Sequence, residues 1–317
     1  MHRIDPFAGD GQWYKGNTHA HSTISDGRLP PEQVVGLYRE MGYDFLALTD
    51  HRVYGVHGDL SDESLVVLPG VEVDCWNLGG DGMCHHVVGL GVPGRNRLAH
   101  GQVLDYADDI RVEALVRFLN GNGNVCLYAH PTWSLVRHEV LAGLEGLLGV
   151  EVYNHGCEVA CADGQSEGHW NRMLWQGSRA FAIASDDTHQ HQLDYGGGWI
   201  CVKARERTAE ALVDSILAGR FYASRGPRID GFSVEDGVVC LGCSPCRSIG
   251  FQVDSQPGMA LDMGDVRRPE GAGYDADGFL VSARIPLRGG ETYVRGVCED
   301  RWGRRAWTQP IRLGETA

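Results

Sequence analysis

The stretch Gly-Asn-Thr-His-Ala-His-Ser, residues 16–22, decides how the rest of the chain is interpreted. It follows a run that is typical of a short first strand. Because side chains alternate between the two faces of a strand, His19 and His21 should point the same way. By itself, such a pair is more often a surface or hydrogen-bonded pair than a metal site, so its meaning depends on what the other strands present.

Working outward from this stretch, short apolar runs alternate with helical patterns as far as residue 187. Residues 30–41, which open at Pro30, and residues 106–119 show the apolar spacing of helices. The expected strands are residues 45–50, 65–73, 86–91, 125–130, 150–154 and 180–187. This alternation predicts an α/β fold with a parallel sheet, either doubly wound or closed into a barrel.

Most of these strands end at, or next to, a histidine or a carboxylate. In a parallel barrel the C-terminal strand ends form one rim, so residues far apart in the sequence meet there. His86 differs because it opens its strand, and Asp26 lies in the loop after the first strand. The residues expected on this rim are His19, His21, Asp26, His51, Glu72, His86, His130, Asp187 and His189.

Imidazoles and carboxylates without thiolates form a donor set that suits Zn, Mn or Fe. So many donors exceed the needs of one ion. We therefore expect two or three clustered divalent ions, with a carboxylate such as Glu72 helping to bridge them and a hydroxide between them. Such an arrangement is typical of hydrolytic enzymes.

Several motifs in this set resemble those of the PHP (polymerase and histidinol phosphatase) family. They are Gly-Asn-Thr-His-Ala-His-Ser (16–22), Ser-Asp-Gly (25–27), Leu-Thr-Asp-His (48–51), Gly-Val-Glu-Val (70–73) and Tyr-Ala-His-Pro (128–131). The resemblance implies a distorted (β/α)7 TIM-like barrel with a trinuclear site whose ligands match the nine residues above. Residues 150–154, 185–189, 218–227 and 306–311 are similar to the CehA/McbA-like branch of the family.

Two of the ligand positions have a neighbour of the same type. His85 precedes His86, and we favour His86 because it adjoins the apolar strand, where the family histidine usually stands. Asp186 precedes Asp187, and the Asp-x-His spacing of the family favours Asp187, with Asp186 as a supporting partner or as the alternative ligand.

Other polar residues lie close to these motifs. Arg52 and Arg225 are candidates for gripping a phosphate oxygen during catalysis, and Lys15 is a weaker one. Asp50 precedes a predicted ligand, where it either orients an imidazole or caps a loop. Each of these charged residues could equally be an ordinary structural or solvated group.

The pattern changes near residue 227. All fourteen histidines lie at or before residue 191, and short strands separated by turns follow residue 228. We expect a metallohydrolase domain over residues 1–227 and a small β-sandwich of unknown role over residues 228–317. Within the latter, Cys240, Cys243 and Cys246 could bind a metal with a fourth ligand such as Cys298, but buried or loop thiols are the default interpretation.

Composition limits the possible partners. The 317 residues include 28 Lys and Arg against 42 Asp and Glu, a formal net charge of −14. This charge argues against extended nucleic acid and against anionic membranes. With no leader pattern at the N-terminus and no long apolar run, we expect a cytoplasmic protein whose ten cysteines are reduced. The oligomeric state is not predicted.

These observations favour a metal-dependent phosphoesterase that hydrolyses a small phosphate ester or phosphodiester with a metal-bridging hydroxide. Because the CehA/McbA-like branch is associated with aryl carbamate hydrolysis, a carbamate or carboxyl-ester hydrolase is the first alternative. A metal-bound binding module without turnover is the second, and the complete ligand set counts against it.

Overall fold

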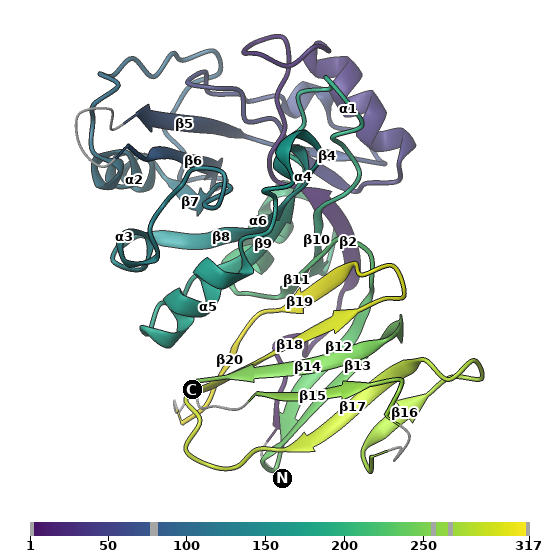
Figure 1. Ribbon diagram of the computed structural model, residues 1–317. Helices are drawn as coiled ribbons and strands as arrows, with labels where there is room; N and C mark the ends of the chain where they lie inside the picture. Colours follow the sequence, from purple (N-terminus) through teal and green to yellow (C-terminus); the bar gives the residue numbers. More distant parts are fainter. Residues whose placement is uncertain (1–2, 77–81, 255–257, 266–268, 315–317) are drawn as a thin grey trace. The chain divides into compact units, whose positions relative to one another are not determined.

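The computed structural model describes residues 3–76, 82–254, 258–265 and 269–314 (Figure 1). The chain divides into two compact units, residues 11–218 and residues 1–10 with 219–317. The sequence pattern predicts a single change at residue 227, whereas in the structure the first residues also belong with the C-terminal unit, because β1 (Arg3–Ile4) pairs with β12 (Ile229–Glu235). The protein is thus a two-domain α/β protein.

The larger unit contains two sheets. In the first, the strands run in the order β10 (Trp199–Ala204), β2 (Gln12–Asn17), β3 (Phe45–Ala47) and β4 (Val66–Leu68). The second has the order β5 (Gly70–Trp76), β6 (Cys84–Gly91), β7 (Asn124–Tyr128), β8 (Leu147–Asn154) and β9 (Phe181–Ser185). Its helices are α1 (Pro31–Glu40), η1 (Gly58–Leu60), α2 (Val112–Gly121), α3 (His138–Ala142), α4 (His155–Cys161), α5 (Glu167–Trp175) and α6 (Ala209–Leu217).

Isolated parallel bridges join these two sheets, one between His51 and Glu72 and one between Ala20 and Thr188. Across the described residues, the ladders do not close into the predicted barrel. The expected strand 65–73 is divided at Pro69, which cannot donate a hydrogen bond to a ladder. The bridge between His51 and Glu72 joins two predicted ligands, and the bridge between Ala20 and Thr188 joins residues that directly neighbour predicted ligands.

The sheets are mixed rather than all-parallel, which corrects the sequence-based expectation. β6 is antiparallel to both β5 and β7, and β10 is antiparallel to β2. The physical reason at β6 is the short link over residues 77–83, since a parallel crossover needs a dozen or more residues. Because β6 runs opposite to β5 and β7, its first residues lie at the same edge of the sheet as the last residues of those two strands.

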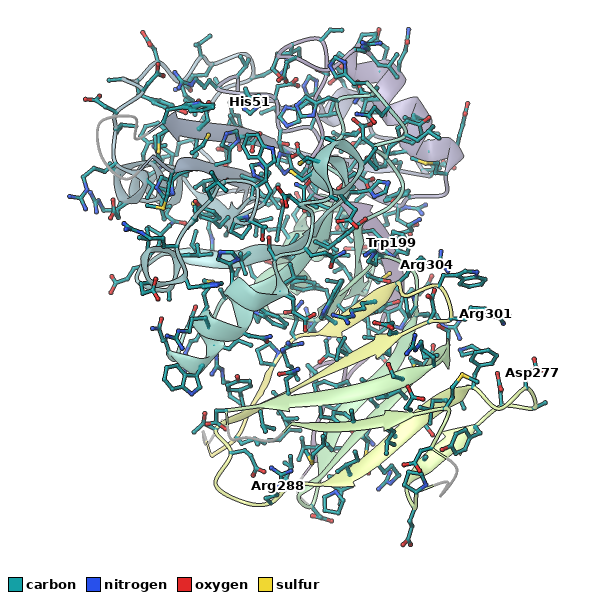
Figure 2. All side chains as sticks on the ribbon, viewed as in Figure 1. His51, Trp199, Asp277, Arg288, Arg301 and Arg304 are labelled. Atoms are coloured by element: carbon teal, nitrogen blue, oxygen red, sulfur yellow. The ribbon has the colours of Figure 1, made fainter. Side chains whose placement is uncertain are left out.

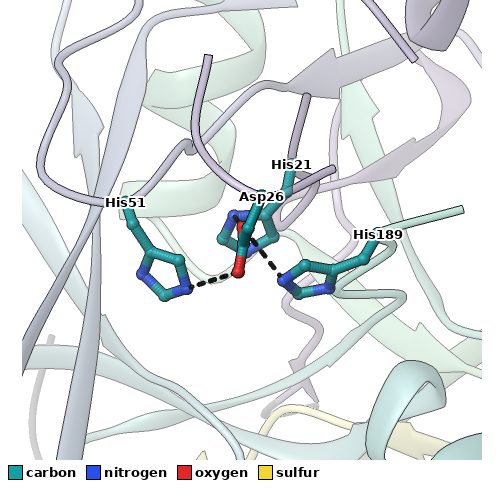
Figure 3. Close-up of side chains that lie close together, drawn as sticks. All are labelled: His21, Asp26, His51 and His189. Carbon is teal, nitrogen blue, oxygen red and sulfur yellow. Dashed lines mark ion pairs between the residues drawn. The ribbon is translucent and has the colours of Figure 1, made fainter. Parts of the chain in front are cut away.

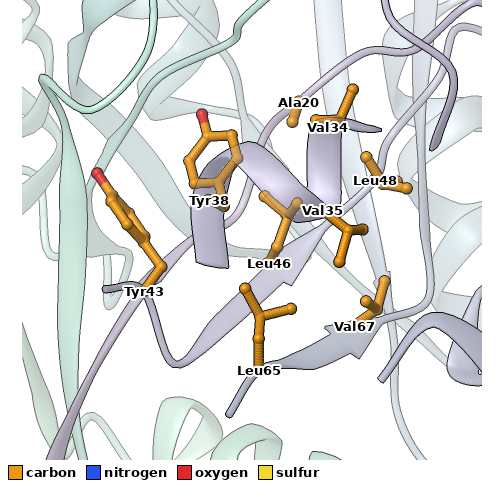
Figure 4. Close-up of a cluster of buried hydrophobic side chains, with 9 residues drawn as sticks. All are labelled: Ala20, Val34, Val35, Tyr38, Tyr43, Leu46, Leu48, Leu65 and Val67. Carbon is orange, nitrogen blue, oxygen red and sulfur yellow. The ribbon is translucent and has the colours of Figure 1, made fainter. Parts of the chain in front are cut away.

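A buried apolar cluster supports the strands that carry the first histidines (Figure 4). Val34, Val35 and Tyr38 occupy one face of α1, as the helical spacing predicts, and pack with Leu46 of β3. Ala20 is fully buried in this cluster. Because neighbouring side chains alternate along an extended segment, its burial directs His19 and His21 away from the apolar core.

The C-terminal unit consists of antiparallel sheets, in agreement with the predicted small β domain. One sheet has the order β1, β12, β13 (Val238–Cys246), β17 (Leu280–Pro286) and β16 (Ala272–Tyr274). The other contains β15 (Met259–Asp262), β14 (Ser248–Val253), β18 (Tyr293–Glu299), β19 (Arg305–Thr308) and β11 (Phe221–Ser224), with β20 (Ile311–Arg312) on β18. β13 contacts β18, so the sheets face each other. No helix in the described parts of the chain could span a membrane.

Candidate metal centre

The nine rim residues predicted from the sequence converge within the larger unit. His21, Asp26, His51 and His189 form one group of neighbouring donor atoms (Figure 3). His19, His21, Glu72 and Asp187 form a second group, and His51, Glu72 and His86 form a third. The Nε2 atom of His130 lies 3.4 Å from Glu72 and 3.6 Å from Asp187. The three groups share members, as expected for adjacent ions.

The spacing of the donor atoms fits a metal ion. Nε2 of His19 lies 3.2 Å from Nε2 of His21, and Oε2 of Glu72 lies 3.2 Å from each of them. Oδ1 of Asp187 lies 3.1 Å from the same two nitrogens. Ligands about 2.1 Å from one ion are separated by about 3.0–3.4 Å, so these four atoms match a shared coordination sphere.

The tautomer of His19 supports this interpretation. Nδ1 of His19 lies 2.9 Å from Oε1 of Glu151, a buried carboxylate. An ionised carboxylate only accepts, so Nδ1 carries the proton and donates it. In neutral His19 the lone pair of Nε2 therefore faces the other donors. This carboxylate–histidine pairing is typical of metal-binding imidazoles.

Glu72 lies at the centre of the cluster. Its Oε2 is 3.2 Å from Nδ1 of His51, while its Oε1 is 2.8 Å from Nδ1 of His86. The two carboxylate oxygens thus face different groups of imidazoles, as a bridging ligand requires. Burial would raise the pKa of Glu72, but the charges of His19, His51 and His86 outweigh it and hold the pKa well below its usual value.

Two buried donor atoms in the cluster lack a hydrogen bond. Nδ1 of His51 and Oδ1 of Asp187 are both inaccessible to solvent and form no well-aligned hydrogen bond, although Oδ1 of Asp187 lies 3.1 Å from Nε2 of His19 and from Nε2 of His21. Leaving a buried polar atom unsatisfied costs about 1–3 kcal/mol. Adjacent cations, one coordinated by each of these atoms, would remove that cost, so the residues present fit the metal ions that the sequence predicts.

Backbone strain is concentrated at the same place. His130 and Asp187 have φ angles of 28° and 52°, and Arg52, next to His51, has a φ of 56°. These residues have side chains, for which such conformations cost about 1–3 kcal/mol each. Strain of this kind is found where function requires a particular side-chain direction, and here it falls on two predicted ligands.

The structure shows which member of each ambiguous pair faces the cluster. His85 points to the hydroxyl of Tyr128, with 2.6 Å between Nδ1 and the oxygen, whereas His86 faces Glu72. Asp186 accepts hydrogen bonds from the hydroxyl of Tyr38 and from the backbone of three consecutive glycines, residues 196–198. Asp187 is the member of its pair that faces the imidazoles.

The predicted basic residues do not share one environment. Arg52 is engaged by two carboxylates: it binds Asp74 through two nitrogens and Asp108 through one, and its guanidinium lies over Tyr106. Lys15 lies 3.9 Å from the ring centroid of Tyr43 and 4.2 Å from that of Trp199, which is labelled in Figure 2.

Arg225 belongs to the smaller unit, where its backbone N–H donates to the carbonyl of Arg305.

Glu151 is the functional residue that sequence reasoning missed. Besides contacting His19, it accepts hydrogen bonds from the backbone of His130, from Ser185 and from Asn154. Asn154 in turn donates to Asp187, with 3.1 Å between Nδ2 and Oδ2. A charged residue inside the apolar run 150–154 was the available signal, since ionised groups are rarely buried without a partner.

A cavity of about 290 Å³ opens onto the cluster. Trp133, Cys157 and Ala160 give it an apolar side, while His191, Gln192 and Asp194 are polar. The ring of Trp133 meets that of His130 edge-on, with 4.9 Å between their centroids. Among the described residues that line the cavity, none is lysine or arginine. The cavity can therefore hold a small molecule directly against the donor atoms.

No protein-family model and no curated protein matches the chain. A two-domain protein from Bacteroides vulgatus, described as containing a predicted PHP-like metal-dependent phosphoesterase, is 17% identical, with 99% of each chain covered and a TM-score of 0.49. A candidate metal-dependent phosphoesterase from Bifidobacterium adolescentis is 16% identical over 55% of this chain and 87% of that chain, with a TM-score of 0.41.

An amidohydrolase from Chromobacterium violaceum, solved with sulfate and without metal, is 18% identical over 65% of this chain and 96% of that chain, with a TM-score of 0.44. All three TM-scores lie below 0.5 and all three identities below 20%, so these similarities assign neither a family nor an activity to the chain. We base the functional proposal on the side-chain cluster, because similarity at this level does not carry an activity from one protein to another.

Proposed function

We propose that the protein is a metal-dependent hydrolase that acts on a small phosphodiester or phosphate ester. The observation that carries this proposal is the convergence of six imidazoles and three carboxylates beside a small cavity, with donor atoms spaced for shared ions. Oε2 of Glu72 and Oδ1 of Asp187 lie 3.2 Å and 3.1 Å from Nε2 of His19, a spacing that suits ligands of one ion.

The cluster fits two or three divalent ions of the Mn, Fe or Zn type. His19, His21, Glu72, Asp187 and His130 would hold one part of the group, and His51 and His86 would extend it through Glu72. Asp26 and His189 would complete it at the more exposed side. When bound, such ions lower the pKa of a water molecule and neutralise charge on the substrate.

The chain's own residues set the protonation pattern. Burial would raise the pKa of Asp187, but His19 and His21 hold it well below its ordinary value. Glu72 is depressed in the same way. Both carboxylates are therefore anionic at neutral pH, so they can hold cations but cannot act as general acids. Glu151 keeps the proton of His19 on Nδ1 and so leaves Nε2 available as a ligand.

The lining of the cavity bears on the charge of the substrate. Because Arg52 is already paired with Asp74 and Asp108, it is poorly placed to serve as a phosphate clamp. Because the described lining residues include no lysine or arginine, no permanently charged side chain is available to neutralise a second negative charge on the substrate. This favours a monoanionic phosphodiester over a dianionic phosphate monoester.

The same lining also favours the second candidate, a carbamate or carboxyl-ester hydrolase. An uncharged substrate needs no basic clamp, and the apolar side formed by Trp133, Cys157 and Ala160 would suit an aryl group. The two candidates share the ions and differ in the attacked atom, which is phosphorus in one case and carbon in the other.

A panel of nitrophenyl substrates tests this assignment. Metal-reconstituted protein should hydrolyse bis(p-nitrophenyl) phosphate faster than p-nitrophenyl phosphate, and chelated protein should hydrolyse neither. Faster hydrolysis of a nitrophenyl carbamate or carboxyl ester would instead favour the second candidate. Metal binding without turnover of any of these activated substrates would count against both and favour a binding module.

A further inference from the structure

Three cysteines of the C-terminal unit form a second cluster that the proposed hydrolase does not use. The sulfur atoms of Cys243, Cys246 and Cys298 all lie within 4.8 Å of one another. All three side chains are buried, and their cysteines are free thiols. Cys243 and Cys246 lie on β13, and Cys298 lies on β18 of the facing sheet, so the cluster spans the interior between the two sheets (Figure 1).

An irregularity in β13 makes this convergence possible. Two residues three positions apart on a regular strand point to opposite faces. Val239, Leu241 and Cys243 are buried in the regular alternation, after which Pro245 is exposed and Cys246 is buried. The pairing of β13 with β17 shifts register between Gly242 and Cys246, so one inserted position turns the second thiol inward.

The chemistry of the cluster differs from that of isolated buried cysteines. A single buried cysteine packs as a small apolar side chain and needs no further explanation. Here three thiols from two facing sheets lie within 4.8 Å of one another, so each can offer a sulfur atom to the same ion. Sulfur ligands about 2.3 Å from one ion lie about 4 Å apart, a separation that this cluster accommodates.

We propose that Cys243, Cys246 and Cys298 form a structural binding site for a thiophilic metal ion, of the class of Zn²⁺ or Cu⁺. Thiolates select these soft ions over Mn²⁺ or Mg²⁺. On binding, each coordinating thiol releases its proton to solvent, and no oxidant or reductant is required. The ion would link β13 to β18 and so fasten the two sheets together. The proposal does not depend on the hydrolase activity.

Cobalt provides the probe, because Co²⁺ bound to thiolates shows a sulfur-to-metal charge-transfer band that imidazole and carboxylate ligands do not produce. Full-length protein, reduced, stripped with a chelator and kept anaerobic, is titrated with Co²⁺. The final amplitude of the band should correspond to one thiolate-bound ion per chain, even though the histidine–carboxylate cluster also takes up Co²⁺. In Cys246→Ser and Cys298→Ser, binding at this site should weaken at least about tenfold, since both remove a ligand.

Cys240→Ser is the matched control. Cys240 lies on the same strand, three residues before Cys243, but it is only partly buried and lies outside the cluster. This variant should retain the full band. The rise in melting temperature on adding Zn²⁺ should be larger in the wild type and in Cys240→Ser than in Cys246→Ser, because the histidine–carboxylate cluster can bind the ion in all three proteins.

Three results would overturn the proposal. The first is the absence of a thiolate band in the wild-type protein, a test that does not depend on any variant folding. The second is an undiminished band in both Cys246→Ser and Cys298→Ser. The third is a count of eight thiols instead of ten when protein purified without reductant is denatured and titrated, if the missing pair maps to the cluster, since that would indicate a disulfide within it. None of these outcomes bears on the hydrolase, whose proposed ligands lie outside this cluster.

Discussion

Glu151 shows at the residue scale how one buried carboxylate organises several others. Its two oxygens accept hydrogen bonds from the ring of His19, the backbone of His130 and the side chain of Asn154. It lies in the 150–154 stretch that resembles the CehA/McbA-like branch, but inside the apolar run rather than at its end, so strand-end placement does not draw attention to it. It acts on the proposed ions through His19 and is therefore a positioning residue.

Replacing Glu151 with glutamine should weaken metal binding by about 10–100-fold, because the amide nitrogen cannot accept the hydrogen bonds that the carboxylate accepts. Activity should recover in part at high metal concentration, and metal-titrated turnover measures this effect. Glu139→Gln, an exposed change on α3, is the control. Equal metal requirements for both variants would show that Glu151 has no such role.

The histidines of the metal-free cluster predict how stability depends on pH. Burial lowers the pKa of both His21 and His86. For His21, Asp187 and Glu72 outweigh burial and raise the pKa to about 9. For His86, Glu72 and Cys84 outweigh it and raise the pKa to about 10. Since both values exceed the unfolded value of about 6.5, the stabilisation is fully present below that pH and is lost as pH rises through the folded pKa values.

The chelated protein should therefore lose stability between about pH 7 and pH 10, as measured by urea denaturation at each pH. Added metal should reduce this dependence, because the ion replaces the protons of the same imidazoles. In His21→Ala the loss with rising pH should be smaller. Stability that stays constant or increases over this range in the chelated wild type would contradict the assignment of these raised pKa values.

At the scale of elements, the position of the ligands at strand ends is easier to predict from the sequence than the direction and length of individual strands. The placement of ligand residues at strand ends follows from short apolar runs, and these runs are visible. The direction of β6 depends on a link too short for a parallel crossover, and the division of the 65–73 strand depends on Pro69. Both signals are in the sequence, whereas the contacts of Glu151 arise only in the folded chain.

The loop that carries Asp26 is held by Asp50. This buried carboxylate accepts hydrogen bonds from the backbone and hydroxyl groups of both Ser22 and Ser25. Of the two roles considered for it, the structure shows the loop-capping one. The loop places Asp26 near His189, with 3.4 Å between Oδ1 and Nε2. The element is thus positioned by hydrogen bonds rather than by apolar packing.

Asp50→Ala should lower the free energy of unfolding by about 1–3 kcal/mol and reduce the metal content of the purified protein, because the buried N–H and O–H groups lose their acceptor. Denaturant unfolding and elemental analysis measure the two effects. Asp62→Ala is a suitable control, since Asp62 caps a separate turn at Ser64 and Leu65. A normal metal content in Asp50→Ala would show that the loop does not position a ligand.

At the scale of the whole molecule, the change from mixed α/β to antiparallel β structure was visible from the histidine distribution and turn residues. The inclusion of residues 1–10 in the C-terminal unit was not, because two residues of β1 carry almost no periodic signal. The cysteine cluster was only partly visible, since the register shift that turns Cys246 inward depends on pairing with β17.

Removing metal should lower the stability of the whole chain. An ion that binds only the folded protein stabilises it by about 2.7 kcal/mol when present at a hundred times its dissociation constant. Calorimetry with and without chelator should therefore show a lower melting temperature after chelation. The shift should be reduced in Asp187→Asn, which alters the carboxylate that faces His19, His21 and His130. An unchanged melting temperature in the wild type would contradict a metal-stabilised fold.

The central claim is that the histidine–carboxylate cluster holds catalytic ions. The most direct test measures turnover of bis(p-nitrophenyl) phosphate against metal content, as chelated protein is reconstituted with Mn²⁺, Fe²⁺ or Zn²⁺. The rate should rise with bound metal and should fall more than about 100-fold in His130→Ala, whose circular dichroism spectrum should match that of the wild type. A rate independent of metal, or full activity in His130→Ala, would contradict it.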